Sequence, residues 1–250
     1  MEARPFIFFE RFLPGVDEQN VHVVTAGFVV LLLTIVSLIV FPRLKEAGKA
    51  VIPERGISVR SLIEALLGML VTLCDDIIGR GGRKYVPFVG SIFFFIFFSN
   101  LIGLVPGFLP PTENCVTGAA VATISFLGFN YFGFREHGLK YLSHFMAPIS
   151  TGPMKSVLLW LLVMVPLCAL HALFGAIELM STMFRPITLS IRLYANIFAD
   201  HQVLGIFSHL VPYGLPVLFL LLGLFVSFMQ AFIFTILTIV YISGAVAHEH

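Results

Sequence analysis

The chain has 250 residues, of which 58% are hydrophobic and only 12% are charged, and its mean hydropathy is +0.98. Soluble domains are about 45–50% apolar and about 25% charged, so this composition excludes an ordinary soluble protein and predicts an all-α polytopic membrane protein. The net charge of +1, with Lys and Arg in short loops, gives no basis for nucleic-acid binding. The three cysteines have no CxxC spacing, so neither a disulfide framework nor a cysteine metal site is indicated.

The first predicted span covers residues 22–41, which is about the length of 20 residues that a helix needs to cross the hydrocarbon core. A basic loop follows it, with Arg43, Lys45, Lys49, Arg55 and Arg60. The positive-inside rule places this loop on the inner side and the N-terminal segment, residues 1–21, outside. That segment lacks the pattern of a signal peptide, so we expect the first span to be retained.

Residues 58–79 are long enough to cross but contain Glu64, Asp75 and Asp76, and basic loops flank them on both sides. Their apolar positions recur at helical spacing: Leu62, Leu66, Met69, Leu70 and Leu73. This pattern predicts one amphipathic helix on the inner surface or against partner subunits, with a crossing helix as the alternative.

A transmembrane hairpin is predicted at 85–108 and 115–134. The loop between them, LPPTENC, has no Lys or Arg and is therefore expected outside, whereas the basic residues after 134 return the chain to the inside. Gly118 and Ala122 lie one helical turn apart, which permits close packing against another helix.

The last two helices are expected at 154–209 and 212–247, giving about five transmembrane or tilted helices in all. The first of them would measure about 80 Å, against a hydrocarbon core about 30 Å thick, so it must be tilted or broken. Pro166 and Pro186 are available as kink points. We predict a long slanted hairpin whose C-terminus lies inside.

Polar groups form a line along this hairpin. On its first helix they recur at spacings of four or seven residues: His171, Glu178, Arg185, Arg192, Asn196 and Asp200. Seven residues on an α-helix drift by only about 20°, so these side chains share one side, while His201 faces nearly opposite on a regular helix. Gln230 and Tyr241 share a face of the last helix.

Arg192 is the most informative residue in the chain. A guanidinium keeps its proton, and holding it at the bilayer centre costs about 2.5–3.5 kcal/mol or more. It therefore needs an anionic partner or a water-filled cavity. Glu178 and Asp200 are the only acids of these two helices before Glu249, which makes a carboxylate of another chain a candidate partner. Acid, imidazole and amide groups in line suit proton or ion passage, whereas a fixed cation would interrupt a continuous proton wire.

Three other interpretations stay open at this point. His171 or Tyr241 alone is more simply a helix-packing contact. A stand-alone ion-coupled transporter would also bury Arg and Glu, although it usually shows an internal repeat, and none is visible here. An intramembrane enzyme would need a nucleophile or a metal cluster, and neither GxSxG nor HExxH occurs.

The segments LSIRLYANIFADHQ and MQAFIFTILTIVYISGAVAHEH resemble the two signature segments of subunit a of F-type (rotary) ATP synthase. SNLIGLVPGFLPPTENCVTGA is similar to the segment between the third and fourth helices of that family. The resemblance implies a non-catalytic stator subunit with two offset proton half-channels to and from a rotor-ring carboxylate. The compact chain, without a visible leader, favours a bacterial inner membrane, with a mitochondrial or plastid membrane as the alternative. The implied partners are the ring of subunit c, peripheral-stalk subunit b, other ATP synthase subunits and membrane lipid, with no cofactor and no metal. A Na⁺-translocating version of the same subunit is an alternative.

The resemblance also implies a set of proton-translocation residues: Arg192, Glu178, Asn196, Asp200, His201, Gln230, His171 and Tyr241. Arg192 falls on the family's essential arginine, which prevents short-circuiting and promotes deprotonation of the ring carboxylate. Gln230 matches the glutamine of the final helix. Where some relatives carry His or Glu seven residues before that glutamine, this chain has Gly223. Asp200 and His201 are candidates to compensate for this departure.

Overall fold

The computed structural model describes residues 20–45, 59–79, 81–105, 108–138, 173, 180, 184–200, 202–207 and 214–246. Its labelled elements are α2 (Val21–Lys45), α3 (Val59–Ile78), η2 (Gly82–Tyr85), α4 (Val86–Gly103), η3 (Pro111–Glu113), α5 (Cys115–His137) and α8 (Leu215–Val246). Residues 184–200 and 202–207 are also helical, and we call 184–200 the arginine helix. No strand occurs among the described residues.

Four helical segments of the described chain are long and apolar enough to cross a membrane: Val21–Ile39, Gly82–Gly103, Cys115–His137 and Val217–Val246. They confirm the expected all-α polytopic membrane fold. Helix α3 is not among them, because it carries three carboxylates. Most of the predicted helix 154–209 lies outside the described residues, and its described part consists of residues 173, 180, 184–200 and 202–207.

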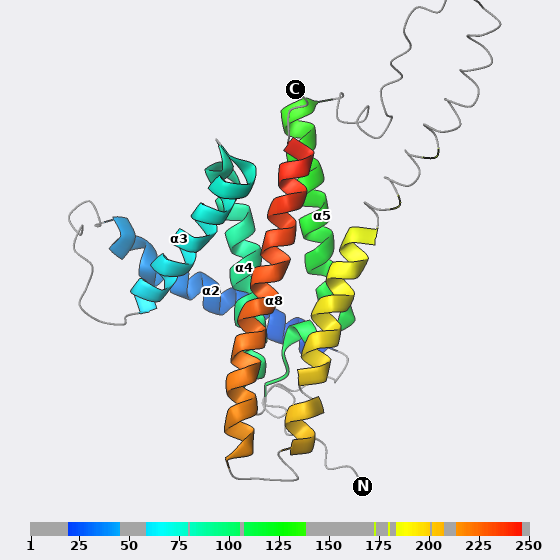
Figure 1. Cartoon of the computed structure of the whole chain (residues 1–250). Coiled ribbons are helices and arrows are strands. Elements are labelled where there is room, and N and C mark those ends of the chain that lie inside the picture. Colours follow the sequence, from blue (N-terminus) through cyan, green and yellow to red (C-terminus); the bar gives the residue numbers. More distant parts are fainter. Residues whose placement is uncertain are drawn as a thin grey trace, which may run out of the picture.

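Helix α8 forms the centre of the bundle and runs between α4 and α5 (Figure 1). The Phe228 ring of α8 packs with its centre 6.2 Å from those of both Phe93 and Phe97 of α4. Around this contact, buried apolar residues of five helices form one cluster: Leu70, Ile92, Phe93, Ile96, Val121, Ala122, Leu189, Leu193, Ile197, Ala231 and Phe234. Because lipid is as apolar as these side chains, their close packing rather than water exclusion holds the helices together.

Hydroxyl groups add polar links to α8 near its C-terminal end. The hydroxyls of Ser125 and Thr238 lie 2.9 Å apart between α5 and α8. Ser243 donates a hydrogen bond of 3.1 Å to the carbonyl oxygen of Ile77, the penultimate residue of α3. Interhelical hydrogen bonds of this kind contribute about 0.6 kcal/mol each on average within membranes.

Charged residues gather at the end of the bundle where α3 ends and α4 begins. Arg83 forms an ion pair of 3.0 Å with Asp75, and Lys84 forms one with Glu136 at the end of α5. Figure 1 shows the C-terminal ends of α3, α5 and α8 at this same end. The opposite end holds η3, where the Thr112 hydroxyl donates a buried hydrogen bond of 2.7 Å to Asn100.

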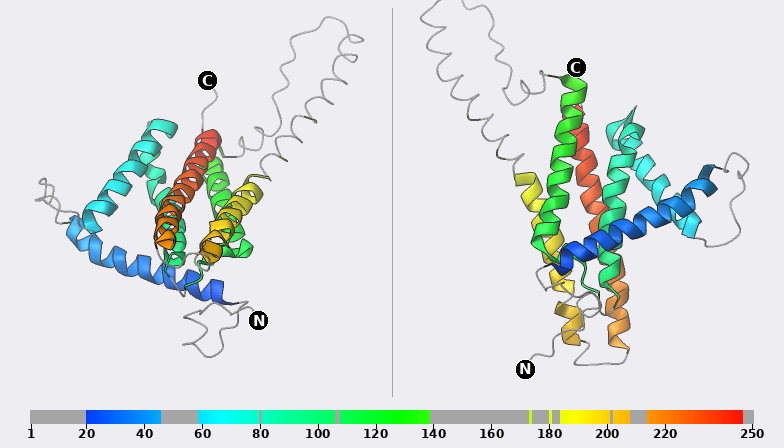
Figure 2. Two further views of the ribbon diagram at one scale, coloured as in Figure 1. Left: turned by 60° about the horizontal axis from the view of Figure 1, so that its bottom comes forward. Right: turned by 180° about the vertical axis from the view of Figure 1, so that it is seen from behind.

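Helix α2 runs obliquely to the other helices and crosses them in the right-hand view of Figure 2. Its first turns contact the chain around η3: His22 lies 3.2 Å from the Asn114 amide, and the rings of Phe28 and Phe108 are 6.2 Å apart. Much of its remaining apolar surface is exposed, including Leu31 and Leu38. Lipid or a partner subunit must therefore cover this helix.

Candidate functional site

The arginine helix is positioned by a buried apolar stripe. Leu189, Leu193 and Ile197 recur every four residues and are 4%, 1% and 6% exposed. They belong to the same cluster as Ala231 and Phe234 of α8. Figure 1 shows the arginine helix, in yellow, beside the middle part of α8. Spacing by four places these side chains on one face of the helix, and this face packs into the bundle.

The arginine helix also approaches α5 closely, at the glycine where the sequence predicted close packing. A Cβ added to Gly118 would lie 3.4 Å from both the carbonyl oxygen and the hydroxyl of Ser190. The Ser190 hydroxyl donates to the carbonyl oxygen of Cys115 at 3.4 Å. Contact with both α5 and α8 therefore sets the rotation of the arginine helix about its own axis.

Gln230 of α8 sets the level of Arg192 along the bundle. Its side-chain amide is 4% exposed and donates a hydrogen bond of 3.5 Å to the backbone carbonyl of Arg192. Farther along, the Arg185 guanidinium lies 4.6 Å from the centre of the Tyr241 ring. The two helices are thus antiparallel. Gln230 lies near the middle of the candidate span Val217–Val246, so Arg192 lies level with the middle of that span.

The Arg192 side chain is exposed about 100° around the helix axis from Leu193, the centre of the buried stripe, and Asn196, one turn farther on, is exposed too. In the part of the chain that the structure describes, no carboxylate lies within ion-pair distance of the guanidinium. The side of the helix that points away from the buried stripe is apolar: Ile191 is 55% exposed and Phe198 is 42% exposed. A permanent cation on an otherwise lipid-compatible surface needs an anion supplied from elsewhere.

Asp200 continues the line of Arg192 and Asn196 and brings it to α8. A Cβ added to Gly223 of α8 would lie only 2.8 Å from a carboxylate oxygen of Asp200. The aspartate is partly buried there. The polar line therefore follows the seam between the two helices from the level of Gln230 to the level of Gly223.

The structure brings together four of the predicted site residues: Arg192, Asn196, Asp200 and Gln230. Tyr241 lies farther along α8, where its ring contacts Arg185 and also packs against Phe129 at 5.7 Å. The remaining three predicted residues, His171, Glu178 and His201, lie outside the described residues.

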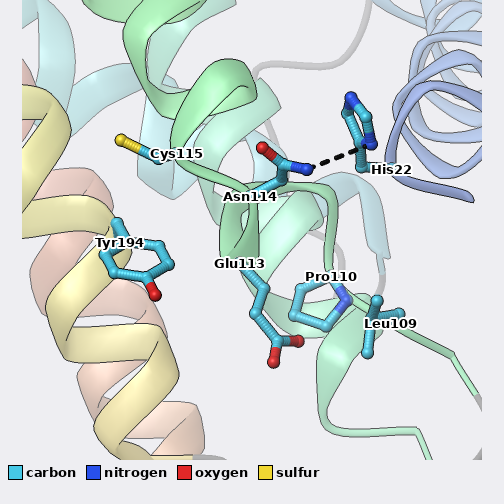
Figure 3. A pocket seen from close by; sticks show the side chains of 7 residues that line it. All are labelled: His22, Leu109, Pro110, Glu113, Asn114, Cys115 and Tyr194. Carbon is cyan, nitrogen blue, oxygen red and sulfur yellow. Dashed lines mark hydrogen bonds between the residues drawn. The ribbon is translucent and has the colours of Figure 1, made fainter. Parts of the chain in front are cut away.

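A pocket at the η3 end of the bundle was not predicted from the sequence. Its volume is about 370 Å³, and His22, Glu113, Asn114 and Tyr194 contribute its polar lining. In Figure 3, Tyr194 faces the pocket from the arginine helix, across from Glu113. No sequence signal pointed to the pocket, because its lining comes from segments far apart in the chain; Asn114 caps α5 by accepting a hydrogen bond of 2.9 Å from the Val116 amide.

No metal centre is found among the described residues, since they contain no group of three or more His, Cys, Asp or Glu side chains placed to hold an ion. The site is thus a polar seam between two helices of a multi-pass membrane protein, with an exposed arginine that has no carboxylate partner among the described residues. Such a seam suits ion passage to or from a partner that carries the opposite charge.

Comparison with known proteins identifies the family. The sequence model described as ATP synthase A chain matches residues 24–243. A relative named ATP synthase subunit a 1, from Syntrophotalea carbinolica, is 38% identical over 259 residues, which cover 99% of this chain and 100% of the relative. ATP synthase subunit a of Bdellovibrio bacteriovorus is 37% identical, covering 96% and 97% of the two chains. That of Solibacter usitatus is 39% identical, covering 90% and 89%.

The chain belongs to the ATP synthase subunit a family. It is therefore a non-catalytic, multi-pass bacterial membrane subunit of the ATP synthase complex, and its partners are other subunits of that complex. Family membership associates it with ATP synthesis and ion transport in the membrane sector. The stand-alone transporter and the intramembrane enzyme are thereby set aside.

Proposed function

We propose that this chain is the stator that passes protons to and from the carboxylates of a rotor ring of subunit c. The observation that carries the proposal is Arg192, which is exposed level with the middle of the candidate span Val217–Val246 and has no anionic partner among the described residues. A ring carboxylate that arrives at this face supplies the missing anion. Peripheral-stalk subunit b is the proposed anchor that keeps the chain from turning with the ring.

The chemistry follows from electrostatics. A ring carboxylate crosses lipid in its protonated form, because carrying its charge through hydrocarbon is costly. A nearby cation lowers the pKa of a carboxyl by about 1–3 units, whereas desolvation raises it. Arrival beside Arg192 therefore releases the proton. The same fixed charge repels a proton moving directly from one half-channel to the other, so passage requires rotation of the ring.

The polar seam supplies the groups of the proposed path. Asp200, with Glu178 and His201, can accept and release protons, while the Asn196 amide can hold water. Gln230 fixes the level of the arginine through its backbone carbonyl. His171 and Tyr241 complete the proposed set. The transmembrane potential contributes about 2.3 kcal/mol per charge per 100 mV, so the gradient sets the direction of rotation.

Cysteine cross-linking tests which face meets the ring. In the assembled complex, with the native cysteines replaced, Ala195→Cys is paired with cysteines introduced one by one around the ring carboxylate. Ala195 is exposed beside Arg192, whereas Leu193 is 1% exposed and faces α8. A disulfide needs Cα atoms within about 7 Å. We expect cross-links from position 195 and none from a Leu193→Cys control. Cross-links from position 193 and none from position 195 would contradict the proposal, because the ring would then meet a different face of the arginine helix.

The proposed orientation places the N-terminus and the η3 end outside and α3 with the C-terminus inside, in the inner membrane. Two cysteines test it. Cys115 is exposed at the start of α5. Cys74 of α3 is buried, and desolvation, followed by the charge of Asp75, raises the pKa of its thiol to about 11. Since the thiolate is the reactive form, Cys74 should resist labelling from either side.

In a Cys168→Ser chain, a membrane-impermeant maleimide is expected to label the protein in spheroplasts but not in inverted vesicles. A Cys115→Ser control should lose this labelling. Labelling of Cys115 only in inverted vesicles would reverse the orientation.

A further inference from the structure

The contact between His22 and Asn114 fixes the hydrogen-bonding roles of both side chains. The carboxamide oxygen of Asn114 accepts a hydrogen bond of 2.9 Å from the Val116 amide and so caps α5. The amide nitrogen of the same side chain therefore points the other way, and it lies 3.2 Å from Nδ1 of His22 (Figure 3). An amide nitrogen donates and does not accept, so Nδ1 of His22 is the acceptor and carries no proton.

This contact lies in a short anchor of α2. Val21, Thr25 and Val29 are fully buried, and they recur every four residues over the first turns of the helix. Beyond Val29, none of the described side chains of α2 is buried. Because the anchor is so short, the loss of one hydrogen bond within it shifts the balance between a docked and an undocked start of the helix.

The groups around His22 decide what its protonation does. Three titratable groups share its pocket: Glu113 of η3, Cys115 of α5 and Tyr194 of the arginine helix. Helix α4, which also packs against α2, has no titratable side chain from Val86 to Gly103, and α2 itself has none between His22 and Arg43. Asp17 and Glu18 lie outside the described residues. In the described part of the chain, Glu113 is thus the acid that faces this pocket.

A protonated imidazole has a donor on both of its nitrogens. Nδ1 of His22 would then face the amide nitrogen of Asn114 donor to donor. Asn114 cannot turn its oxygen toward the imidazole without giving up the cap on the Val116 amide. The Glu113 carboxylate in the same pocket, by contrast, attracts the new positive charge.

We propose that His22 and Asn114 form a proton-sensitive clamp between α2 and the start of α5. The clamp is closed while His22 is neutral. A proton on Nδ1 removes the acceptor, the imidazolium turns from Asn114 toward Glu113, and the start of α2 is released. Histidine changes its charge between about pH 5 and 8, so acidification at the η3 end opens the clamp. This inference goes beyond the proposed function, because it concerns how α2 is held and not how ions pass.

Asn114→Asp gives the sharpest test, because it should reverse the effect of pH. Asp and Asn cap helices about equally well, so the start of α5 should be preserved. The aspartate presents an oxygen to His22 where Asn114 presents an N–H group, so protonation of His22 now creates an ion pair and closes the clamp. In a second variant, His22→Asn, a side-chain oxygen replaces Nδ1 as an acceptor that does not titrate. This clamp should stay closed at either pH.

The distance between α2 and α5 is measured with spin labels in the assembled complex, in lipid vesicles held at about pH 8 or at about pH 5. The labels are attached to Gly27→Cys on α2 and Ala119→Cys on α5, in a chain whose native cysteines are replaced. Both positions are exposed, and a Cβ added to Gly27 would meet nothing within 4 Å. Electron paramagnetic resonance then gives the populations of short and long distances.

In the otherwise wild-type chain, we expect the ratio of long to short distances to rise about fivefold between about pH 8 and about pH 5, the change that loss of one hydrogen bond produces. The ratio should stay constant in His22→Asn and should fall on acidification in Asn114→Asp.

Three results would overturn the clamp. The first is a ratio that does not respond to pH in the wild-type chain, and the second is a rise in Asn114→Asp like that of the wild type. The third is an undiminished rise in His22→Asn, which would place the titrating group elsewhere. None of these measurements depends on proton pumping, so the clamp can fail while the proposed function stands, and the proposed function can fail while the clamp stands.

Discussion

Replacement of Arg192 by alanine is expected to lower ATP-driven proton pumping at least about 100-fold, while the complex still assembles and hydrolyses ATP. Assembly should survive because the side chain is exposed and makes no ion pair within the described residues. Pumping should not survive, because without the fixed positive charge that separates the two half-channels, protons can return from one to the other without rotation of the ring.

The measurement is quenching of a pH-sensitive dye in inverted vesicles after ATP is added. Arg185→Ala is the matched control: it removes an arginine from the same helix, but one held over the Tyr241 ring at 4.6 Å. Such a contact is worth about 0.5–2 kcal/mol, so this variant should lose some stability yet keep most of its pumping. Equal losses in both variants would mean that the two arginines act alike and that Arg192 has no special role.

The second large effect is expected at Gly82, where the chain turns from α3 into α4. A Cβ there would lie 2.3 Å from the carbonyl oxygen of Cys74 and 2.8 Å from its carbonyl carbon. Both are backbone atoms inside α3, so no side chain can move to make room. Overpacking costs about 1–3 kcal/mol even where side chains can adjust. Gly82→Ala should therefore separate α3 from η2 and deplete the chain from membranes.

Gly68→Ala provides the control, because it makes the same change on α3 where an added Cβ would meet nothing within 4 Å. Immunoblotting of membranes should show a normal amount of this variant and about tenfold less of Gly82→Ala. Normal accumulation of Gly82→Ala would show that the tight corner is not needed for folding.

The sequence predicted the class of fold because the lengths of its apolar runs and the charges of its loops are local properties. The polar line was predictable for the same reason, because residues 192, 196 and 200 share a side of any regular helix. Which residues of two different helices contact each other was harder to predict from the sequence. That Gln230 lies opposite Arg192 was available through resemblance to a family, and not from spacing, since the two residues belong to different helices.

Contacts between distant segments could not be predicted. His22 and Asn114 are 92 positions apart, and their 3.2 Å contact depends on the oblique course of α2. The close approach at Gly82 depends equally on how the chain returns along α3. The sequence showed Gly223 only as a departure from the family it resembles. That the Asp200 carboxylate lies beside this glycine became visible only in the structure. The proposed anion for Arg192 belongs to another chain, so its position could not be predicted from this sequence.

Passive proton conductance through the membrane sector tests the central claim most directly. The catalytic sector is stripped from inverted vesicles that contain wild-type or Arg192→Ala complexes, a potential is imposed, and proton flux is recorded. If the arginine separates two half-channels, its removal should let ring carboxylates carry protons across without net rotation, and the Arg192→Ala vesicles should leak protons while their ATP-driven pumping is lost. Vesicles of this variant that neither pump nor conduct would contradict the account, because the barrier between the half-channels would then lie elsewhere.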